Sequence, residues 1–330
     1  MIISKTPLRI SFAGGGTDLP SFYKENEYGA ALSVAIDNYI YVVVKKHSSL
    51  FKERIRLNYS ETELVDDVDK IKNPIIRECL KFLHIDDRLF INTIADAPGS
   101  SGLGSSSAFC VGLLKALYKY KGIIVSPGRL AEEAAYIEIE KLARPIGKQD
   151  HYAAAYGGLN YYCFRSNGTV SIAPVIVSED IINTIFDCMV SFWTGITRPS
   201  EEVLLEQDKN NNKNRDNLLA MRQQAKDLLD LLNCKEFSIE SFSKIIHEGW
   251  MIKKKLASKV SNLLIDKWYG IALKNGALGG KISGAGAGGF LNVFAEKTKQ
   301  DKIIKTLQKE GLVQFKFNID YSGSKVSILE

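Results

Sequence analysis

The amino-acid sequence predicts a two-domain protein of the α+β class. Its 330 residues suit about two domains of ordinary size. Runs rich in β-branched and aromatic residues mix with amphipathic helical runs, but they do not follow the strict strand–helix alternation of a parallel doubly wound sheet. The pattern also changes near residue 180. We therefore expect one domain over residues 1–180 and a second over residues 181–330.

The first half is expected to mix strands with helices. Its best helix signal is the serine-led apolar run that begins at Ser105, and Ser126-Pro127 is typical of the N-cap and first position of a second helix. Strands are predicted where β-branched and aromatic residues gather. In chain order we expect strands over residues 1–12, 38–46 and 88–95, helices over 105–120 and 126–142, and a strand pair over 159–164 and 169–173.

The second half is expected to be richer in helices. Residues 186–193 are apolar and predict a buried strand. Residues 206–216 contain four asparagines and no apolar residue, so we expect an exposed loop or a frayed helix start there. Amphipathic helices are then predicted over residues 215–232, 238–255 and 261–275, and strands over residues 290–294, 313–318 and 325–329.

The composition is that of an ordinary globular chain. Hydrophobic residues make up 45% and charged residues 25% of the sequence, which provides enough apolar material for a core. The 43 Lys and Arg residues exceed the 38 Asp and Glu residues, for a net charge of +5, but they are spread along the chain without interleaved aromatics. We therefore expect no nucleic-acid partner, whereas a small phosphate-bearing substrate suits this balance.

Cysteine usage favours a reducing compartment. The five cysteines are isolated and odd in number, and none forms a Cys-x-x-Cys pair, which argues against a disulfide framework or a zinc site. The N-terminal run reads as a strand rather than a signal peptide, and no apolar run approaches the length of a membrane span. The sequence predicts a cytoplasmic protein without membrane association.

Three small-residue segments carry the candidate chemistry. The first, residues 7–18, ends a predicted strand in three glycines followed by Thr17 and Asp18. Glycines permit positive φ and close approach of the backbone, and the Thr hydroxyl and Asp carboxylate offer partners to a polyhydroxylated ligand. A tight turn with a helix cap at Thr17 or Asp18 is the alternative interpretation.

The second segment, residues 98–108, leads directly into the helix predicted from Ser105. Its small side chains leave backbone N–H groups uncovered, and the helix start adds a partial positive charge, so the segment is suited to hold phosphate. A serine hydroxyl would add a hydrogen bond or a Mg²⁺ ligand. One serine would suffice as a helix cap, so this run of glycines and serines exceeds what capping requires.

The third segment, residues 279–289, contains a GxGxxG spacing at Gly284, Gly286 and Gly289. This spacing raises a nucleotide-dependent oxidoreductase as an alternative function. That fingerprint requires a strand before the loop and a helix after it, whereas here a helix is predicted before the loop and a strand after it. A Walker A sequence is also missing, because no Gly-Lys pair in the chain is followed by Ser or Thr.

An acidic residue completes the set. Asp150 lies between Lys148 and His151 at a predicted helix start, where a carboxylate can orient or deprotonate a hydroxyl group. A solvated helix cap is the alternative role for this aspartate.

Together and in this order, the three segments resemble the motifs of the GHMP kinases, the family of galactokinase, homoserine kinase, mevalonate kinase and phosphomevalonate kinase. Residues 98–108 resemble its second motif, a proline followed by a GLGSSA-like run, and residues 281–290 resemble its third, a glycine-rich loop leading into a strand. The match covers essentially the whole chain. Residues 7–23 and 194–198 look most like the branch that acts on D-glycero-D-manno-heptose 7-phosphate.

The resemblance implies a fold and a nucleotide site. The expected fold has an N-terminal domain like the second domain of ribosomal protein S5 and a ferredoxin-like C-terminal domain, with the active site between them. ATP would place its phosphates at the helix start, and Mg²⁺ would be held by Ser106 and Glu140, with Glu138 close by as the alternative carboxylate. The residues expected to bind ATP are Pro98, Gly99, Ser100, Ser101, Gly102, Leu103, Gly104, Ser105, Ser106 and Ser107.

The resemblance also implies a catalytic pair and a sugar site. Asp150 matches the family's catalytic aspartate, which would accept or orient the proton of the sugar hydroxyl, and Arg9 matches the arginine that pairs with it and holds the carboxylate ionised. The expected substrate-binding residues are Gly15, Gly16, Thr17 and Asp18, with Gly284 and Gly286 in the loop that would close over the reacting phosphoryl group. Cations for a phosphate on the sugar are expected among Arg144, Lys148 and Arg198.

The implied activity is ATP-dependent phosphorylation of the anomeric hydroxyl of D-glycero-D-manno-heptose 7-phosphate, which gives the 1,7-bisphosphate on the way to nucleotide-activated heptose. The fucokinases share the Arg-Ile-x-Phe-Ala-Gly-Gly core of the first segment, so a fucokinase-like or other hexose 1-kinase is the alternative. The joint presence of Arg9, Ser106, Glu140 and Asp150 disfavours a kinase-like regulatory protein without turnover. The sequence leaves a homodimer open.

Overall fold

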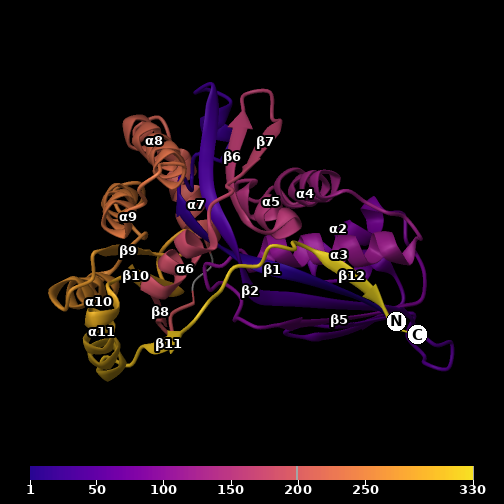
Figure 1. Cartoon of the computed structure of the whole chain (residues 1–330). Coiled ribbons are helices and arrows are strands. Elements are labelled where there is room, and N and C mark those ends of the chain that lie inside the picture. Colours follow the sequence, from indigo (N-terminus) through magenta and orange to yellow (C-terminus); the bar gives the residue numbers. More distant parts are fainter. Residues whose placement is uncertain (198–199, 330) are drawn as a thin grey trace.

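Two β-sheets organise the fold, and helices pack against each of them (Figure 1). The computed structural model describes residues 1–197 and 200–329. The larger sheet has eight strands in the order β12-β1-β2-β5-β3-β4, with β6 paired to β2 and β7 paired to β6. These strands are β1 (Ile2–Ala13), β2 (Tyr28–Lys46), β3 (Ile55–Asn58), β4 (Thr62–Val65), β5 (Leu89–Ala95), β6 (Leu159–Arg165), β7 (Val170–Pro174) and β12 (Lys325–Ile328).

The long strand β2 runs through the larger sheet. Its second half alternates between the buried Ile40, Val42 and Val44 and partly exposed residues, which is the period-two pattern of a strand with one face on the core. Its first half pairs with β6 and its second half with β5. The helical elements of this half are α1 (Pro20–Tyr23), η1 (Val68–Lys70), α2 (Pro74–Phe82), α3 (Ser105–Tyr120), α4 (Pro127–Ala135), η2 (Tyr136–Lys141) and α5 (Gln149–Tyr156).

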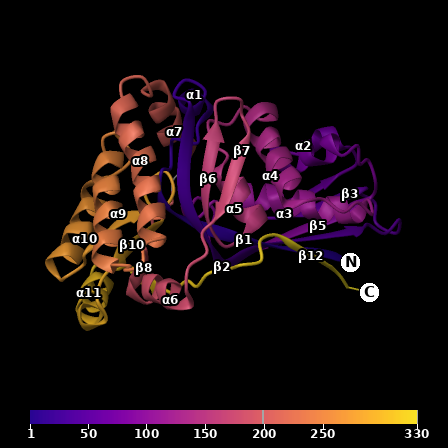
Figure 2. The ribbon, with the colours of Figure 1, turned by 45° about the horizontal axis from the view of Figure 1, so that its top comes forward.

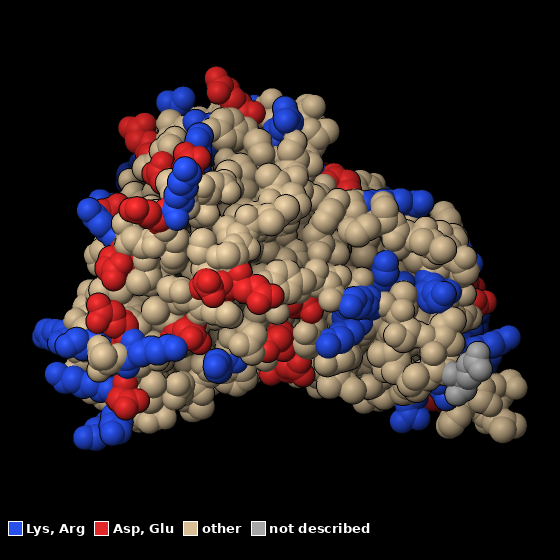
Figure 3. Space-filling model, in the orientation of Figure 1, with Lys and Arg blue, Asp and Glu red and all other residues tan. Residues whose placement is uncertain are grey.

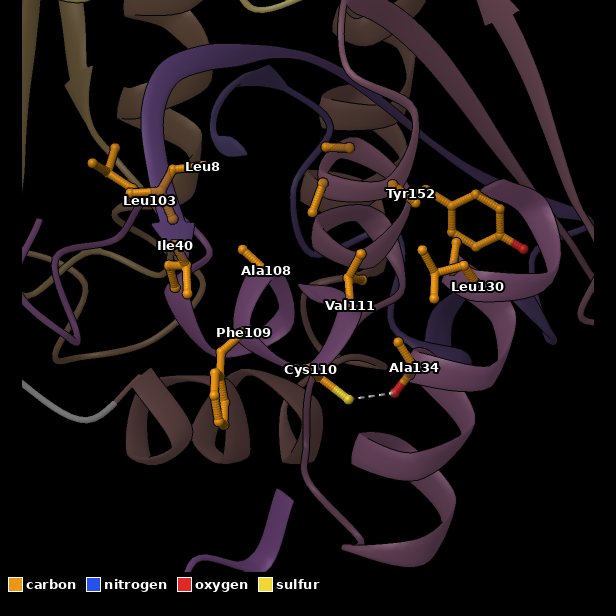
Figure 4. Packing of buried hydrophobic residues seen from close by; sticks show 14 of the residues in the cluster. Leu8, Ile40, Leu103, Ala108, Phe109, Cys110, Val111, Leu130, Ala134 and Tyr152 are labelled. Atoms are coloured by element: carbon orange, nitrogen blue, oxygen red, sulfur yellow. Dashed lines mark hydrogen bonds between the residues drawn. The ribbon is translucent and has the colours of Figure 1, made fainter. Parts of the chain in front are cut away.

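The core of this half lies between the sheet and helices α3, α4 and α5. Figure 4 shows Leu8 and Ile40, from β1 and β2, on one side of α3, with Leu130 of α4 and Tyr152 of α5 on the other and Val111 of α3 between them. All five side chains are buried. Because burial of a Val, Leu or Ile side chain contributes about 1.5–3 kcal/mol, this packing fixes α3 on the sheet and thereby places its N-terminus.

The smaller sheet has four strands in the order β11-β8-β10-β9. Its strands are β8 (Met189–Trp193), β9 (Gly279–Ile282), β10 (Phe290–Phe294) and β11 (Val313–Phe315), and the helices of this half are α6 (Glu179–Cys188), α7 (Ser200–Lys209), α8 (Arg215–Leu232), α9 (Ile239–Lys253), α10 (Leu263–Lys274) and α11 (Lys297–Lys309). Figure 2 shows α8 beside α9, and α8 also packs against β2 of the larger sheet. Helix α8 therefore ties the two halves together.

The strand predicted over residues 186–193 is wrong in its first part. Residues 179–188 form α6, which is capped by the Ser178 hydroxyl at the Ile181 N–H, and only Met189–Trp193 is a strand. The buried residues Ile182, Ile185 and Phe186 follow helical spacing. Because Phe186 and Cys188 at the end of α6 lead directly into the apolar residues of β8, composition alone did not separate the two.

The exposed loop or frayed helix start predicted over residues 206–216 is only partly correct, because residues 210–214 form a turn between α7 and α8 in which Asn212 and Lys213 are exposed. Helix α7 extends to Lys209, and Gln207, Asn211 and Asn214 are buried. Asn214 Nδ2 donates to the Leu256 carbonyl at 2.8 Å, and Asn211 Nδ2 donates to Ser21 Oγ at 2.5 Å. Buried amides that find hydrogen-bond partners are tolerated in a core, so the polar composition did not indicate exposure here.

The C-terminal strand, β12, belongs to the larger sheet, although its residues lie in the second expected domain, 181–330. β12 pairs antiparallel with β1, with Ile2 opposite Ile328. The Leu329 N–H donates to the Met1 carbonyl at 2.8 Å, and both ends of the chain lie together in Figure 1. The expected boundary near residue 180 falls between β7 and α6, but the last strand crosses back over it.

On the face drawn in Figure 3, basic and acidic side chains lie near one another. Within residues 1–197 and 200–329, none of the helices has the length and apolarity needed to cross a membrane.

Candidate active site

The three small-residue segments meet at a cavity of about 360 Å³. The end of β1, the N-terminus of α3, the start of α5 and the loop between β9 and β10 form most of its wall, and α7 and α9 complete it. The expected site residues that line it are Arg9, Gly15, Gly16, Asp18, Ser100, Ser101, Gly102, Gly104, Ser105, Ser106, Ser107, Asp150, Gly284 and Gly286. The fold therefore brings together segments that are far apart in the sequence.

Of the residues expected to bind ATP or the sugar ring, four do not line the cavity. Pro98 and Gly99 are exposed outside its rim, and the Leu103 side chain is buried in the apolar core. Thr17 is fully buried, and its Oγ1 lies 2.8 Å from the Gly14 and Ala30 carbonyl oxygens while accepting the Ala30 N–H at 2.9 Å. The Thr17 hydroxyl thus holds the turn in place, and the expectation that it contacts the sugar is corrected.

Asp150 is held by Arg9 through two parallel hydrogen bonds. Arg9 Nε donates to Asp150 Oδ1 at 2.7 Å, and Arg9 Nη2 donates to Oδ2 at 2.6 Å. The third donor, Nη1, reaches the Gly102 carbonyl at 2.6 Å. The Arg9 side chain is only 6% exposed, whereas the Asp150 side chain is 25% exposed. The bidentate guanidinium therefore fixes a carboxylate that remains open to the cavity.

Asp18 presents a second carboxylate to the same cavity. Its Oδ1 accepts the Gly16 N–H at 2.9 Å, and its Oδ2 accepts the Gln149 N–H at 3.1 Å. Burial raises the pKa of Asp18, and the charge of nearby Asp150 raises it further. The backbone approaches very closely here, because a Cβ on Gly147 would lie 1.9 Å from Asp18 Oδ2. Asp18 is thus a fixed acceptor for hydroxyl groups.

The loop before α3 has the features of a phosphate cradle. Gly102 and Gly104 have positive φ values of 82° and 79°, which favour glycine, and the turn exposes the N-terminus of α3 to the cavity. Ser101 Oγ and Ser105 Oγ are buried without a hydrogen-bond partner among the described residues. A buried hydroxyl left without a partner costs about 1–3 kcal/mol, so these groups indicate a polar ligand such as phosphate oxygens.

The third glycine segment joins two antiparallel strands. β9 precedes it and β10 follows it, with Leu291 opposite Ile282. It packs on the phosphate cradle, because a Cβ on Gly289 would lie 2.1 Å from the Ser101 carbonyl oxygen. The predicted order is corrected in one respect, since a strand and not a helix lies directly before the loop. A strand also follows it, so the helix that a dinucleotide fingerprint requires is missing from this described segment.

The acidic residue beside Ser106 is Glu138 and not the expected Glu140. Ser106 Oγ donates to Glu138 Oε1 at 2.5 Å, and His151 Nε2 lies 2.8 Å from Glu138 Oε2. Glu138 is fully buried and lines the cavity, whereas Glu140 is exposed and does not. The structure therefore does not bring Glu140, the expected metal ligand, to the cavity or to Ser106, and it brings Glu138 there instead.

The physical reason is the wider turn at the end of α4. This helix continues into the π-helix η2 (Tyr136–Lys141), where the Leu142 N–H donates to the carbonyl of Ile137, five residues earlier, at 3.0 Å. Such insertions change which side chains face inward and often occur at functional sites. A regular period of 3.6 residues cannot predict which of the two glutamates points to the cavity.

Glu138 is kept charged by its neighbours. Burial would raise the pKa of Glu138, but hydrogen bonds from His151 and Ser106 and the charge of Arg144 hold it below its usual value. Arg144 Nη1 donates to Glu138 Oε1 at 2.6 Å and to Ser106 Oγ at 2.7 Å. One ionised carboxylate and one hydroxyl are the hard oxygen donors that Mg²⁺ takes beside nucleotide phosphates and water.

These donors fit a magnesium ion that is shared with a nucleotide. The described residues contain no cluster of three or more His, Cys, Asp and Glu side chains that would hold a metal alone. Mg²⁺ commonly uses only one or two protein oxygens when phosphates supply the rest. The donor set of Ser106 and Glu138 agrees with that use.

The three cations expected for a sugar phosphate have different positions. Arg144 lines the cavity but is paired with Glu138. Lys148 Nζ lies 2.5 Å from Glu132 and donates to the Gly168 carbonyl at 2.9 Å, so it is engaged outside the cavity, and its expected role is corrected. Arg198 lies outside the residues that the structure describes.

Among the cavity residues without a role in the sequence prediction are Gln207 and Lys253. Gln207 of α7 is 2% exposed, and its Nε2 has no hydrogen-bond partner among the described residues. A Cβ on Gly16 would lie 2.3 Å from this nitrogen. Lys253, the last residue of α9, is also buried and lines the cavity. The helical spacing of Leu204 and Gln207 was the available signal for α7, but the neighbouring asparagines masked it.

Comparison with known proteins agrees with this geometry. Two family models match the chain, "GHMP kinases N terminal domain" over residues 71–158 and "GHMP kinases C terminal" over residues 230–312. D-glycero-alpha-D-manno-heptose 7-phosphate kinase of Campylobacter jejuni is 32% identical to this chain, and the match covers 99% of this chain and 98% of the relative. Galactokinase of Pyrococcus furiosus is 24% identical, with 99% and 98% covered.

Solved structures show the same fold. A D-glycero-D-manno-heptose 1-phosphate kinase from Bacteroides thetaiotaomicron superposes with a TM-score of 0.79 at 24% identity, and 100% of each chain is covered. A putative sugar kinase from Campylobacter jejuni superposes with a TM-score of 0.77 at 28% identity, with 99% of this chain and 98% of the other covered. The predicted α+β fold with two domains is confirmed. The chain belongs to the GHMP kinase family and is an ATP-dependent sugar kinase.

Proposed function

We propose that this kinase transfers the terminal phosphoryl group of ATP to the anomeric hydroxyl of D-glycero-D-manno-heptose 7-phosphate and so supplies the 1,7-bisphosphate for nucleotide-activated heptose. The observation that carries the proposal is the position of Asp150. Its carboxylate lies on the cavity together with Asp18 and with the N-terminal serines of α3, so an acceptor hydroxyl and a donor phosphate fit on either side of it. The identity to the Campylobacter heptose kinase supports this choice of acceptor.

The sugar is proposed to bind against Asp18, Gly15 and Gly16. The fixed Asp18 carboxylate accepts hydrogen bonds from hydroxyl groups, and the two glycines let the ring approach the backbone. The Gln207 amide, which has no partner for its Nε2 among the described residues, donates to a sugar oxygen. These contacts orient one hydroxyl toward Asp150.

Asp150 is proposed to accept or orient the proton of that hydroxyl. Its two oxygens are bound by Arg9 at 2.6 and 2.7 Å, which holds the carboxylate ionised and in one orientation but makes it a weaker base. Positioning and electrostatic stabilisation then carry much of the rate enhancement, as is usual for phosphoryl transfer. The N–H groups at the start of α3 would bind the phosphate oxygens, with Ser101 and Ser105 as further donors.

Ser106 and Glu138 are proposed to hold Mg²⁺ when the nucleotide is bound. The ion would neutralise charge on the phosphates and orient the terminal one. Arg144, which contacts both residues, keeps their oxygens in place. Gly284 and Gly286, in the loop over the cavity, would shield the reacting phosphoryl group from water.

The test is ADP release from Mg-ATP with a panel of acceptors. The panel contains heptose 7-phosphate, heptose 1-phosphate, mannose, fucose, galactose and mevalonate. We expect turnover with heptose 7-phosphate, and ³¹P NMR of the product should show a new phosphate ester at the anomeric carbon. Preference for fucose or another unphosphorylated hexose would keep the sugar kinase and replace the acceptor. Turnover of heptose 1-phosphate alone would contradict the proposed position of transfer.

Two further predictions concern the cellular location and the oligomeric state of the enzyme. We infer a cytoplasmic location, because ATP is the phosphate donor and is available there. The homodimer stays a prediction, and light scattering during size-exclusion chromatography tests it, with a mass of one chain, 36.7 kDa, as the contradicting result.

A further inference from the structure

Among the residues that the structure describes, three cationic side chains line the cavity, and they differ in their partners. Arg9 is bound to the Asp150 carboxylate, and Arg144 is bound to the Glu138 carboxylate. The third, Lys253, forms no ion pair with a carboxylate within residues 1–197 and 200–329. Of the three, Lys253 is therefore the one without a direct ion pair among these residues, although the carboxylates of Asp18 and Asp150 also act on its charge.

Lys253 is also deeply buried. It is 6% exposed, and its Nζ donates to the carbonyl oxygen of Gly284, in the loop between β9 and β10. An ammonium group has three donors, so this bond leaves two of them for a ligand. Burial of a charge is costly unless it is paired, and burial, together with the nearby charge of Arg9, lowers the pKa of Lys253 to about 8.

A second buried lysine, Lys281, differs from Lys253 in its partners, so a buried lysine with a single carbonyl partner is not a general feature of this fold. Lys281 of β9 is also 6% exposed, but its Nζ donates to the carbonyls of Ser11 at 2.8 Å and Phe12 at 3.3 Å. Lys281 does not line the cavity. Two carbonyls satisfy this interior ammonium, whereas Lys253 has one carbonyl and faces the cavity.

We propose that Lys253 Nζ is a phosphate ligand, which binds a non-bridging oxygen of a substrate phosphate group within the cavity. The proposal rests on the proposed kinase function, which places two such phosphates there: the terminal phosphate of ATP and the phosphate carried by the sugar. By holding both that oxygen and the Gly284 carbonyl, Lys253 would also tie the glycine loop to the bound substrate.

The experiment compares Lys253→Met with Lys281→Met. Both changes remove a buried ammonium, but only the first removes one that faces the cavity. Steady-state kinetics are measured with the sugar that the wild-type enzyme accepts, whichever it is, and with its analogue that has the phosphate removed or added. Affinity for inorganic pyrophosphate, measured by calorimetry, gives a second readout that does not depend on turnover. Lys253→Gln replaces the Met variant if thermal unfolding shows that the latter does not fold.

Two results support the proposal and identify the phosphate. If Lys253 binds the transferred group, kcat falls about 100-fold with phosphorylated and unphosphorylated acceptors alike, because a donor to a developing charge is lost, and pyrophosphate affinity falls at least tenfold. If it binds the phosphate of the sugar, KM rises at least tenfold for the phosphorylated acceptor alone. Lys281→Met should stay within about twofold of the wild type in each quantity.

Other results overturn the proposal. It is wrong if Lys253→Met keeps kcat, each KM and pyrophosphate affinity within about threefold of the wild type, or if Lys281→Met loses as much as Lys253→Met. Failure of the wild-type enzyme to use heptose 7-phosphate instead contradicts the proposed function and leaves the comparison of the two lysines valid with another acceptor.

Discussion

Gly102 and Gly284 are packed so closely that neither has room for a side chain. A Cβ on Gly284 would lie 2.6 Å from Gly102 Cα, and a Cβ on Gly102 would lie 2.5 Å from the Ser283 carbonyl oxygen. Both glycines also have positive φ. Gly102 belongs to the phosphate cradle before α3, and Gly284 belongs to the loop between β9 and β10, so this contact joins the two halves of the protein at the cavity.

The first prediction concerns this contact. Gly284→Ala should lower the free energy of unfolding by about 1–3 kcal/mol, because a side chain at positive φ is strained, and it should raise the KM for ATP by separating the two loops. Urea unfolding and steady-state kinetics measure the two effects. Gly270→Ala is the control, since a Cβ there meets no atom within 4 Å and alanine favours the helix by about 1 kcal/mol. Wild-type stability and KM in Gly284→Ala would contradict the prediction.

The second prediction concerns the proton of the acceptor. Asp150→Asn should lower kcat by about 10²–10⁴-fold if the carboxylate is the general base, with little change in the KM for ATP. A loss of only a few-fold would exclude an essential proton acceptor and leave Asp150 as an electrostatic positioner. Asp86→Asn is a suitable control, because Asp86 is 73% exposed and pairs with Arg54 away from the cavity.

The third prediction separates Glu138 from Glu140. Glu138→Gln should raise the Mg²⁺ concentration required for half-maximal activity at least tenfold, because it removes the ionised oxygen beside Ser106. Glu140→Gln should leave that concentration unchanged, since Glu140 is exposed and outside the cavity. Titration of Mg²⁺ at fixed ATP measures both. The opposite order of the two variants would restore Glu140 as the metal ligand.

The fourth prediction concerns stability at alkaline pH. The pKa of Lys253 is lowered by burial from its ordinary value of 10.5 to about 8, so the unfolded chain binds this proton more tightly than the folded one does. The contribution of Lys253 to the free energy of unfolding should therefore rise between pH 8 and pH 10.5, and below pH 8 its burial should cost on the order of 3 kcal/mol. The measurement is the difference between wild type and Lys253→Met in urea unfolding across this range.

That difference should shrink as the pH rises, with the variant more stable at pH 7. The comparison with the variant is needed because Arg9, Asp18 and Asp150 also act on Lys253, and Lys281 has a lowered pKa for the same reason of burial. In the wild type, kcat/KM should also fall as the pH passes 8, since neutral Lys253 no longer attracts phosphate. A difference in stability that stays constant from pH 7 to pH 10.5 would show that Lys253 has the same pKa in the folded and the unfolded chain. That result would contradict the prediction.

The fifth prediction concerns Gln207, whose replacement should weaken sugar binding without lowering the stability of the protein. Gln207→Leu should raise the KM for the sugar about tenfold, because a donor to a sugar oxygen is lost, and should leave the KM for ATP unchanged. The free energy of unfolding should stay the same or increase, since the change removes a buried amide nitrogen that lacks a partner among the described residues. Gln223→Leu, on the exposed side of α8 where Gln223 bonds Asp227, is the control. An unchanged KM for the sugar would exclude Gln207 from its site.

The sequence predicted the parts of the site that depend on backbone chemistry. Glycines at positive φ and a serine-led helix start are local signals, so the approach of Gly102, Gly104 and Ser106 to the cavity followed from them together with the family resemblance. Arg9 and Asp150 were paired only through that resemblance, because no local pattern relates a strand residue to the start of a distant helix. Their roles in catalysis stay predictions.

The remaining parts depended on features that a sequence pattern does not carry. In the π-helix after α4, Glu138 and not Glu140 lines the cavity. Helical periodicity could not predict this, because it assumes a regular turn. Gln207 and Lys253 are polar residues inside the protein, where composition predicts exposure. Helices α2 and α11 were not predicted at all, although Ile75, Ile76, Cys79 and Leu80 of α2 are buried at helical spacing.

The pairing of β12 with β1 has a consequence for the synthesis of the chain. Strand β1 is made first, but the partner on its outer edge consists of residues 325–328, so this edge stays open on the ribosome until almost every other element has been made. Open strand edges are templates for pairing with other chains. The nascent protein must therefore pass through a period in which the strand that carries Arg9 is open to intermolecular pairing, and chaperone occupancy should be greatest just before residue 325 emerges.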